Sequence, residues 1–234
     1  MSRYQALILG ASGAIGQAFL THFQNDAQCA LAVGLSRQSV LRFELEDEDS
    51  MAHCATALRQ TSGPYGVCEF KYIVDATGAL TLDGQGPEKR LQALNAKQLL
   101  RQFEVNAVGP ALLIKHFSPL LVTHEAACYA TLSARVGSIE DNHKGGWYGY
   151  RAAKAARNML LQTAAIEAFR QKPLAIFAAL QPGTVQSGLS AKFVAAEDAM
   201  TPEDSVSQMM RALQSLKPTG RAQFVDYAGH TIPW

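Results

Sequence analysis

The sequence predicts an α/β fold in which a doubly wound parallel sheet carries helices on both of its faces. Three observations predict it. Short apolar stretches alternate with longer amphipathic ones, as strand–helix–strand units require. A glycine-rich turn follows the first apolar stretch, residues 6–9, and precedes a helical pattern. The 234 residues, 48% of them hydrophobic, suffice for a sizeable core. No repeat or linker divides the chain, so we expect one domain over residues 1–234.

The expected elements follow one another at short intervals. After residues 6–9, apolar runs predict strands at 30–35, 40–45, 71–74, 128–132, 174–180 and 222–225. Amphipathic patterns predict helices after the glycine-rich turn, at 51–58, from 95 to beyond 112, from 150 to about 169, and at 202–216. Thr201 is the expected N-cap of the last helix.

The helix that opens at Asn95 contains an expected irregularity. Residues 95–98 resemble a capping box, and Pro110 lies four residues after Asn106. Proline lacks an N–H, so the Asn106 carbonyl loses its helical partner and is free to accept a hydrogen bond from water. A helix boundary near residues 109–110 is the alternative.

Charge and composition exclude several classes of function. Lys and Arg number 21 and Asp and Glu 20, so no basic excess favours nucleic acid or an anionic membrane surface. No apolar stretch approaches the ~20 residues of a membrane span, and the N-terminus lacks a signal-peptide layout. Four cysteines without a C-x-x-C pair suit free thiols in the cytoplasm. The six histidines show no metal-binding spacing, so no metal is expected.

The glycine-rich turn is the first candidate site. Glycines allow a tight turn and let the backbone approach a pyrophosphate, and the following helix N-terminus offers free N–H groups and a positive dipole end. A purely structural turn is the alternative, but the place directly after the first strand favours a dinucleotide. The expected cofactor-binding residues here are Gly10, Ser12, Gly13, Ala14, Ile15 and Gly16.

The end of the second strand bears on which dinucleotide is bound. An acid about 20 residues after the glycines would hold the ribose hydroxyls of NAD. Here Ser36 and Arg37 occupy this place. A guanidinium pairs well with a phosphate, so NADP(H) is favoured over NAD(H). The alternative is that Arg37 is an ordinary surface residue.

Tyr150 and Lys154 form the candidate catalytic pair. Their spacing of four places them on one helix face. The ammonium favours the phenolate, so we expect Lys154 to lower the pKa of Tyr150 from about 10 and to let the phenol exchange a proton with a substrate oxygen. Tyr148 has Ala152 at the same spacing, so it lacks a cation four residues later and is not the candidate. Taken alone, the Tyr150–Lys154 spacing is weak evidence, and an ordinary solvated helix surface is the better interpretation.

Polar residues follow three later strands of the predicted sheet. Residues 75–78 end the strand at 71–74, two serines, Ser133 and Ser138, follow the strand at 128–132, and Gln181-Pro182-Gly183-Thr184-Val185 closes the next one. In an open parallel sheet, such strand ends face the cofactor. A serine there is a candidate hydrogen-bond donor to a carbonyl. The loop at 188–201, with Phe193 and Val194, suggests an apolar cover.

These features, in this order, resemble the short-chain dehydrogenase/reductase family over nearly the whole chain. Within the family, residues 133–139 (SARVGSI), 145–154 (GGWYGYRAAK) and the final Ile232-Pro233-Trp234 look most like bacterial C-factor and sniffer-type carbonyl reductases. The resemblance implies a Rossmann-like fold and a hydride transfer between nicotinamide and a carbonyl or alcohol substrate. It also implies a homodimer or homotetramer.

The resemblance also implies roles for single residues. Tyr150 would be the general acid, Lys154 would bind the nicotinamide ribose, and Asn106 would hold a water linking Lys154 to solvent. Ala76, Thr77 and Gly78 would line the cofactor, and so would Pro182, Gly183, Thr184 and Val185. Asp75 stands where the family usually has asparagine, and Ala134 where it has the catalytic serine.

The replacement of that serine leaves two choices open. We favour Ser133 over Ser138 as the residue that polarises the carbonyl, because strand ends twist, although neighbouring strand residues point to opposite faces. The missing serine also leaves open a second function, a non-enzymatic NADP(H)-binding redox sensor or signalling factor on the same fold. An isomerase or dehydratase that retains its cofactor is a third interpretation.

Overall fold

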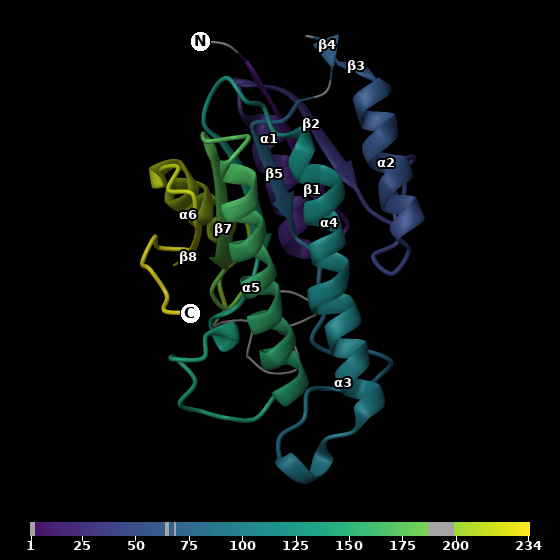
Figure 1. The fold of residues 1–234 in the computed structure, drawn as a ribbon, viewed down its shortest axis with the longest axis vertical. Helices are drawn as coiled ribbons and strands as arrows, with labels where there is room; N and C mark the ends of the chain where they lie inside the picture. Colours follow the sequence, from purple (N-terminus) through teal and green to yellow (C-terminus); the bar gives the residue numbers. More distant parts are fainter. Residues whose placement is uncertain (1–2, 64–65, 68, 187–198) are drawn as a thin grey trace.

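The computed structural model describes residues 3–63, 66–67, 69–186 and 199–234. Its centre is a parallel six-stranded sheet in the order β2-β1-β5-β6-β7-β8 (Figure 1). The strands are β1 Tyr4–Leu9, β2 Cys29–Leu35, β5 Tyr72–Asp75, β6 Ala127–Leu132, β7 Ala175–Gln181 and β8 Ala222–Asp226. A separate antiparallel pair joins β3 Ser62–Gly63 to β4 Gly66–Val67. The predicted α/β fold with a parallel sheet is confirmed.

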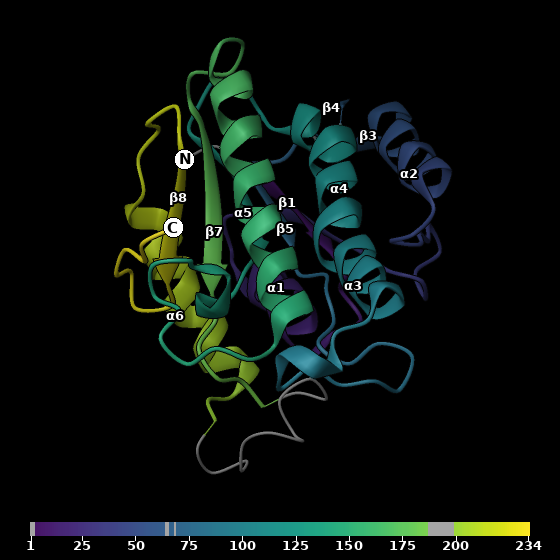
Figure 2. The same cartoon turned by 60° about the horizontal axis from the view of Figure 1, so that its bottom comes forward.

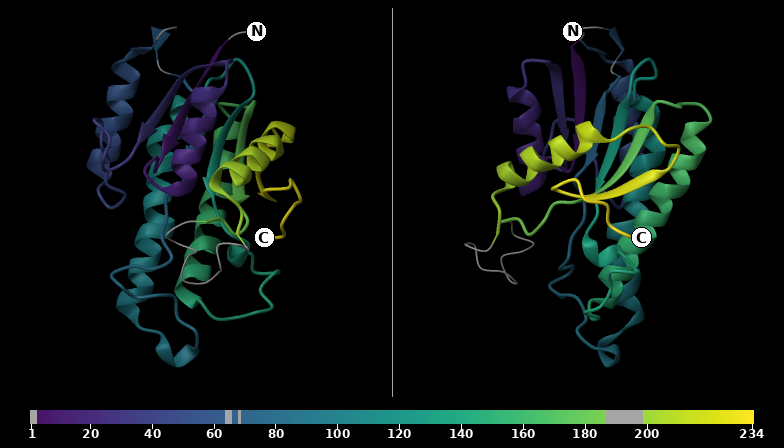
Figure 3. Two further views of the ribbon diagram at one scale, coloured as in Figure 1. Left: turned by 180° about the vertical axis from the view of Figure 1, so that it is seen from behind. Right: turned by 90° about the vertical axis from the view of Figure 1, so that its left-hand side faces the viewer.

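Helices cover both faces of the sheet. They are α1 Ala14–Asn25, α2 Glu48–Gln60, α3 Ala96–Phe103, α4 Gly109–Phe117, α5 Tyr148–Phe169 and α6 Pro202–Ser215. Helices α2, α4 and α5 cover one face, as Figure 2 shows, and α1 and α6 lie together on the other face (Figure 3). Among the described residues, no helix is both long and apolar enough to cross a bilayer.

Strand β1 shows how the sequence divides the core between these faces. Successive strand side chains point to opposite sides of a sheet. Leu7 and Leu9 therefore pack with the residues of α2, α4 and α5, whereas Ala6 and Ile8 pack with those of α1 and α6. All four side chains are fully buried. A continuous apolar run is what a strand buried on both faces requires.

The predicted strand at residues 40–45 is wrong. This segment has no strand pairing in the structure, and β2 is the edge of the sheet on that side. Local hydrogen bonds hold both ends of the segment instead. The Ser39 hydroxyl contacts the Ser36 and Leu41 carbonyls, and Asp47 caps α2 through the Asp49 and Ser50 N–H groups. Phe43 is still buried, and the half-buried Leu41 and Leu45 pack against the core, whereas Val40 is exposed.

The irregularity predicted around Asn106 is confirmed and takes the form of a π-helical turn. Residues Glu104–Val108 form this turn between α3 and α4, and Gly109 donates to the Glu104 carbonyl, one residue further back than in an α-helix. The backbone stays right-handed helical through Val108 and Gly109, so the helix is widened rather than ended. The predicted caps Asn95 and Thr201 accept hydrogen bonds from Gln98 and Asp204.

Candidate active site

Helix α5 brings Tyr150 and Lys154 to the carboxyl end of the sheet. Both are buried, at 6% and 3% exposure, whereas Tyr148 is exposed to 37%. The buried residues of α5 recur every three to four positions, as expected for one face of a helix packed on a sheet. The sequence-based choice of Tyr150 over Tyr148 thus agrees with the direction in which each side chain lies.

The start of α5 depends on a residue that the sequence analysis did not single out. Trp147 precedes the helix in a left-handed conformation and makes no side-chain cap. Glu88, from the loop after β5, takes over this role. Its carbonyl accepts from the Trp147 N–H, and its carboxylate accepts from the Gly149 N–H at 3.1 Å. The two segments are 61 residues apart, so no local sequence pattern reveals this cap.

A cleft of about 520 Å³ opens beside Tyr150 and Lys154. Four strand ends contribute to it, as expected for the ligand site of a parallel sheet. Its lining includes most of the predicted cofactor-binding residues and Ser133: Gly13, Ala14, Ile15, Gly16, Ala76, Thr77, Gly78, Ser133, Tyr150, Lys154, Pro182, Gly183, Thr184 and Val185. The predicted cover at residues 188–201 lies outside the described residues except for 199–201, as do Phe193 and Val194.

The glycine-rich turn packs closely against the start of α1. A Cβ on Gly16 would lie 2.2 Å from the Gly10 carbonyl oxygen, so only glycine fits there. Gly10 and Ala11 both donate to the Leu35 carbonyl, which brings the end of β2 beside the turn. Ser36 is buried, while Arg37 and Ser12 are exposed. These three residues and Gly10 do not line the cleft itself.

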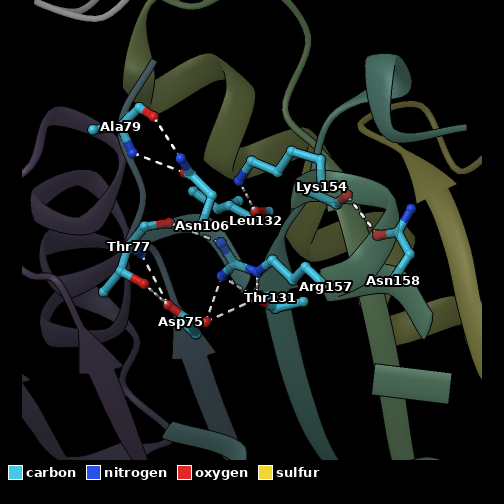
Figure 4. A network of polar contacts seen from close by, with 10 residues as sticks. Asp75, Thr77, Ala79, Asn106, Thr131, Leu132, Lys154, Arg157 and Asn158 are labelled. Carbon is cyan, nitrogen blue, oxygen red and sulfur yellow. Dashed lines mark hydrogen bonds and ion pairs between the residues drawn. The ribbon is translucent and has the colours of Figure 1, made fainter. Parts of the chain in front are cut away.

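Asn106 lies next to the cleft and holds its wall. Its side chain pairs with the Ala79 backbone, accepting from the N–H at 3.0 Å and donating to the carbonyl at 2.8 Å (Figure 4). Gly78 precedes this contact with φ +125, and a Cβ there would lie 2.8 Å from Asn106 Oδ1 and 3.3 Å from Lys154 Nζ. Asn106 therefore fixes the turn that faces Lys154. Its role in holding a water stays a prediction.

The expected lowering of the Tyr150 pKa by Lys154 is wrong for this structure. Burial raises the pKa of Tyr150 to about 12, and the cation that opposes this rise is Arg157. The Lys154 ammonium donates to the Leu132 carbonyl at 3.0 Å. Burial, followed by repulsion from Arg157, holds the pKa of Lys154 well below its usual range. Loss of water is thus the largest influence on the pKa of each group.

The two candidate serines lie in different surroundings. Ser133 lines the cleft, and its buried hydroxyl donates to Asn158 Oδ1 of α5 at 2.7 Å. Ser138 is outside the cleft lining, and its oxygen accepts from the Asp141 N–H at 3.0 Å. Its hydroxyl also lies 3.4 Å from the Trp234 carbonyl. Of the two, only Ser133 shares the cleft with Tyr150.

A buried ion pair beneath the cleft was also missed. Arg157 bonds to Asp75 at the end of β5, and both side chains are almost fully buried. The available signal was a lone aspartate at the end of a buried strand, which requires a cationic partner. Arg157 lies three residues after Lys154, on the same helix face.

Comparisons with known proteins agree with this geometry. No family model matches the chain. The C-signal protein of Myxococcus xanthus is 32% identical over 137 residues, which is 58% of this chain and 78% of that protein. A 1-hydroxy-2-glutathionyl-2-methyl-3-butene dehydrogenase of Rhodococcus sp. is 29% identical over 162 residues, or 69% of this chain and 67% of that protein. A short-chain dehydrogenase of Neurospora crassa is 31% identical over 154 residues, or 62% of this chain and 59% of that protein.

Solved structures match the fold over the whole chain. Carbonyl reductase Sniffer of D. melanogaster gives a TM-score of 0.82 at 19% identity and covers 99% of this chain and 100% of its own. An NADPH-bound carbonyl reductase from chicken fatty liver gives 0.82 at 19% identity and covers 100% of both chains. The fold is Rossmann-like, and the similarity to named dehydrogenases makes the protein an oxidoreductase. Fold and sequence similarity together show that the chain belongs to the short-chain dehydrogenase/reductase family.

Proposed function

We propose that the protein is an NADP(H)-dependent carbonyl reductase or alcohol dehydrogenase, with Tyr150 as its general acid and base. The observation that carries this proposal is the single cleft shared by Tyr150, Lys154, the glycine-rich turn and the ends of β5, β6 and β7. A dinucleotide and a small carbonyl compound would meet there. Bound nicotinamide supplies or accepts the hydride in this chemistry.

The cleft fits a dinucleotide on structural grounds. The first turn of α1 begins at Gly13 without a side-chain cap and without an acidic residue. Its N–H groups and positive dipole end are therefore suited to a pyrophosphate. Gly78 keeps the cleft wall free of a Cβ beside Lys154. Arg37 is exposed at the end of β2, beside the turn, which supports a contact with a 2′-phosphate.

In this proposal, Tyr150 donates its phenolic proton to the substrate oxygen during reduction and takes it back during oxidation. Lys154 orients the ribose, and Ser133 donates a hydrogen bond to the carbonyl. Asn106 holds the cleft wall around Gly78 and binds a water near Lys154. The proposed substrate is a small carbonyl or alcohol compound.

The proposal is tested by fluorescence titration with NADPH and NADH, followed by turnover on a panel of carbonyl compounds. We expect NADPH to bind more tightly, and Arg37→Ala to weaken NADPH about tenfold or more while NADH changes little, because one charge-assisted hydrogen bond is lost. Arg59→Ala, an exposed arginine on α2, is the matched control.

Tyr150→Phe should bind NADPH as the wild type does and lose about a hundredfold or more in turnover, because the proton donor is absent. Tyr148→Phe is its control and should stay near wild type. Failure to bind either nucleotide would overturn the proposal. Tight NADPH binding with no turnover on any carbonyl would favour the redox sensor instead.

Assembly, domain number and compartment stay predictions from the sequence. They are a homodimer or homotetramer, a single domain and the cytoplasm.

A further inference from the structure

Arg157 and Asp75 form a closed polar network below the cleft (Figure 4). Arg157 bonds to the Asp75 carboxylate, and its Nε donates to Thr131 Oγ1 at 2.7 Å. The Thr131 hydroxyl in turn donates to Asp75 Oδ2 at 2.9 Å. The exposed fractions of the two charged side chains are 1% and 0%. Asp75, Thr131 and Arg157 come from β5, β6 and α5, respectively.

The same network holds the turn after β5. Asp75 Oδ1 accepts from the Thr77 N–H at 2.9 Å and from the Thr77 hydroxyl at 2.5 Å. Arg157 Nη1 donates to the Thr77 carbonyl at 3.0 Å. Thr77 and the following Gly78 line the cleft. The ion pair is thus directly joined to the wall of the proposed cofactor site.

Arg157 also lies close to the candidate catalytic pair. It follows Lys154 by three positions and Tyr150 by seven, so all three lie on one face of α5. A Cβ on Gly78 would be 3.3 Å from Lys154 Nζ and 3.6 Å from Arg157 Nη1, so both cations approach the same point. A guanidinium stays protonated at every working pH, whereas a buried ammonium gives up its proton more readily.

Other charged groups lie along this part of the molecule. Lys154 and Arg157 belong to α5, Asp75 ends β5, and Glu88 from the loop after β5 accepts from the Gly149 N–H. Arg135 lines the cleft after β6 and pairs with Asp141 and Asp226. Arg157 is the one whose charge opposes the effect of burial on the pKa of Tyr150.

We propose that Arg157 is a positioning residue whose permanent positive charge, held in place by Asp75, favours the ionised form of Tyr150. This inference rests on the proposed function, because ionised Tyr150 is the base for alcohol oxidation. It assigns to Arg157 part of the electrostatic task expected of Lys154. A buried ion pair is weak support for stability alone, since apolar residues of similar size often replace such pairs without loss.

The test measures the phenol directly. The probe is 3,5-difluorotyrosine incorporated at position 150. Its phenol is more acidic than that of tyrosine, so it titrates at a pH at which the protein is still folded. Its ionisation is followed by ¹⁹F NMR without substrate or cofactor. Asp75→Asn leaves Arg157 without its counter-ion and should move the midpoint to lower pH. Asp75→Asn with Arg157→Leu removes both charges and should move it to higher pH. At a fixed pH below the midpoint, the ionised fraction in the double variant should fall about tenfold.

Two comparisons separate charge from packing. Arg157→Lys keeps the charge and should stay nearer to the wild type than the double variant does. Lys71→Leu with Glu125→Gln removes an ion pair at the other end of β5 and should leave the midpoint unchanged. Midpoints that do not move, or that move in the same direction in Asp75→Asn and the double variant, would overturn the inference.

Turnover distinguishes this inference from the proposed function. In an active enzyme, the double variant should lose about tenfold in kcat for alcohol oxidation at that pH, with a smaller change in KM. A wild type that is inert on every substrate would remove the proposed function, yet the ¹⁹F midpoints would still decide whether Arg157 acts on the phenol. An active wild type with unmoved midpoints would remove the inference alone.

Discussion

Residue 134 is alanine where the family resemblance leads us to expect a serine, so in the proposed mechanism the carbonyl is polarised by a neighbour. Ser133 shares the cleft with Tyr150, but its hydroxyl donates to Asn158. We expect Ser133→Ala to lower kcat/KM about tenfold to a hundredfold, because a hydrogen bond to the developing negative charge is lost. Steady-state kinetics on one active carbonyl substrate measures this effect.

Two further variants make this prediction specific. Ser138→Ala should change kcat/KM much less, because Ser138 lies outside the cleft lining. Ala134→Ser places a hydroxyl where the family resemblance leads us to expect the catalytic serine and should raise kcat. A larger loss in Ser138→Ala than in Ser133→Ala would reverse the assignment.

The Tyr150 pair shows what residue spacing predicts and what it leaves out. The spacing of four correctly predicted that Tyr150 and Lys154 share one helix face, and the structure shows that this face is buried. It predicted the wrong direction for the pKa of Tyr150, because that pKa depends mainly on burial of the phenol, which spacing does not report. For the same reason, Asp75 was noticed as a departure from the family while its partner Arg157 was not.

At the scale of elements, the position of α5 depends on the loop that contains Glu88. We expect Glu88→Ala to lower the free energy of unfolding by about 1–2 kcal/mol, the usual cost of losing a helix cap. It should also lower turnover, because Tyr150 lies in the first turn of this helix. Urea unfolding and kcat measure the two effects. Glu140→Ala, an exposed acid in the loop before α5, is the control, and equal losses in both variants would argue against a cap.

The elements differ in how well periodicity predicts them. Helix α5 and strands such as β6 have strong patterns and were placed to within a residue or two. Residues 40–45 have an equally apolar pattern but form no strand, since the Ser39 and Asp47 side chains stabilise turns at either end. The pattern reports burial of Phe43 correctly, but burial alone does not supply a neighbouring strand.

At the scale of the whole molecule, successive side chains of a strand point to opposite faces of the sheet, and this decides which layer of helices each side chain contacts. Cys128 and Tyr129 are neighbours on β6, yet Cys128 packs among the residues of α1 and α6 and Tyr129 among those of α4 and α5. The layers were predictable because they follow from period two. The network of Asp75, Thr131 and Arg157 was not, because it requires three elements to meet.

Burial of the Cys128 thiol lowers the stability of the whole protein at alkaline pH. Burial raises the pKa of Cys128 from 9.0 to about 12. Above pH 9.0 the unfolded chain loses this proton and the folded one keeps it, so the free energy of unfolding falls as pH rises toward 12. Urea unfolding under reducing conditions should show the advantage of wild type over Cys128→Ala shrinking by about 1.4 kcal/mol between about pH 8 and about pH 10. Lys154, whose pKa is lowered, acts in the opposite direction in both proteins and cancels in this difference. A difference that stays constant with pH would show that the Cys128 thiol ionises equally in the folded and unfolded chains.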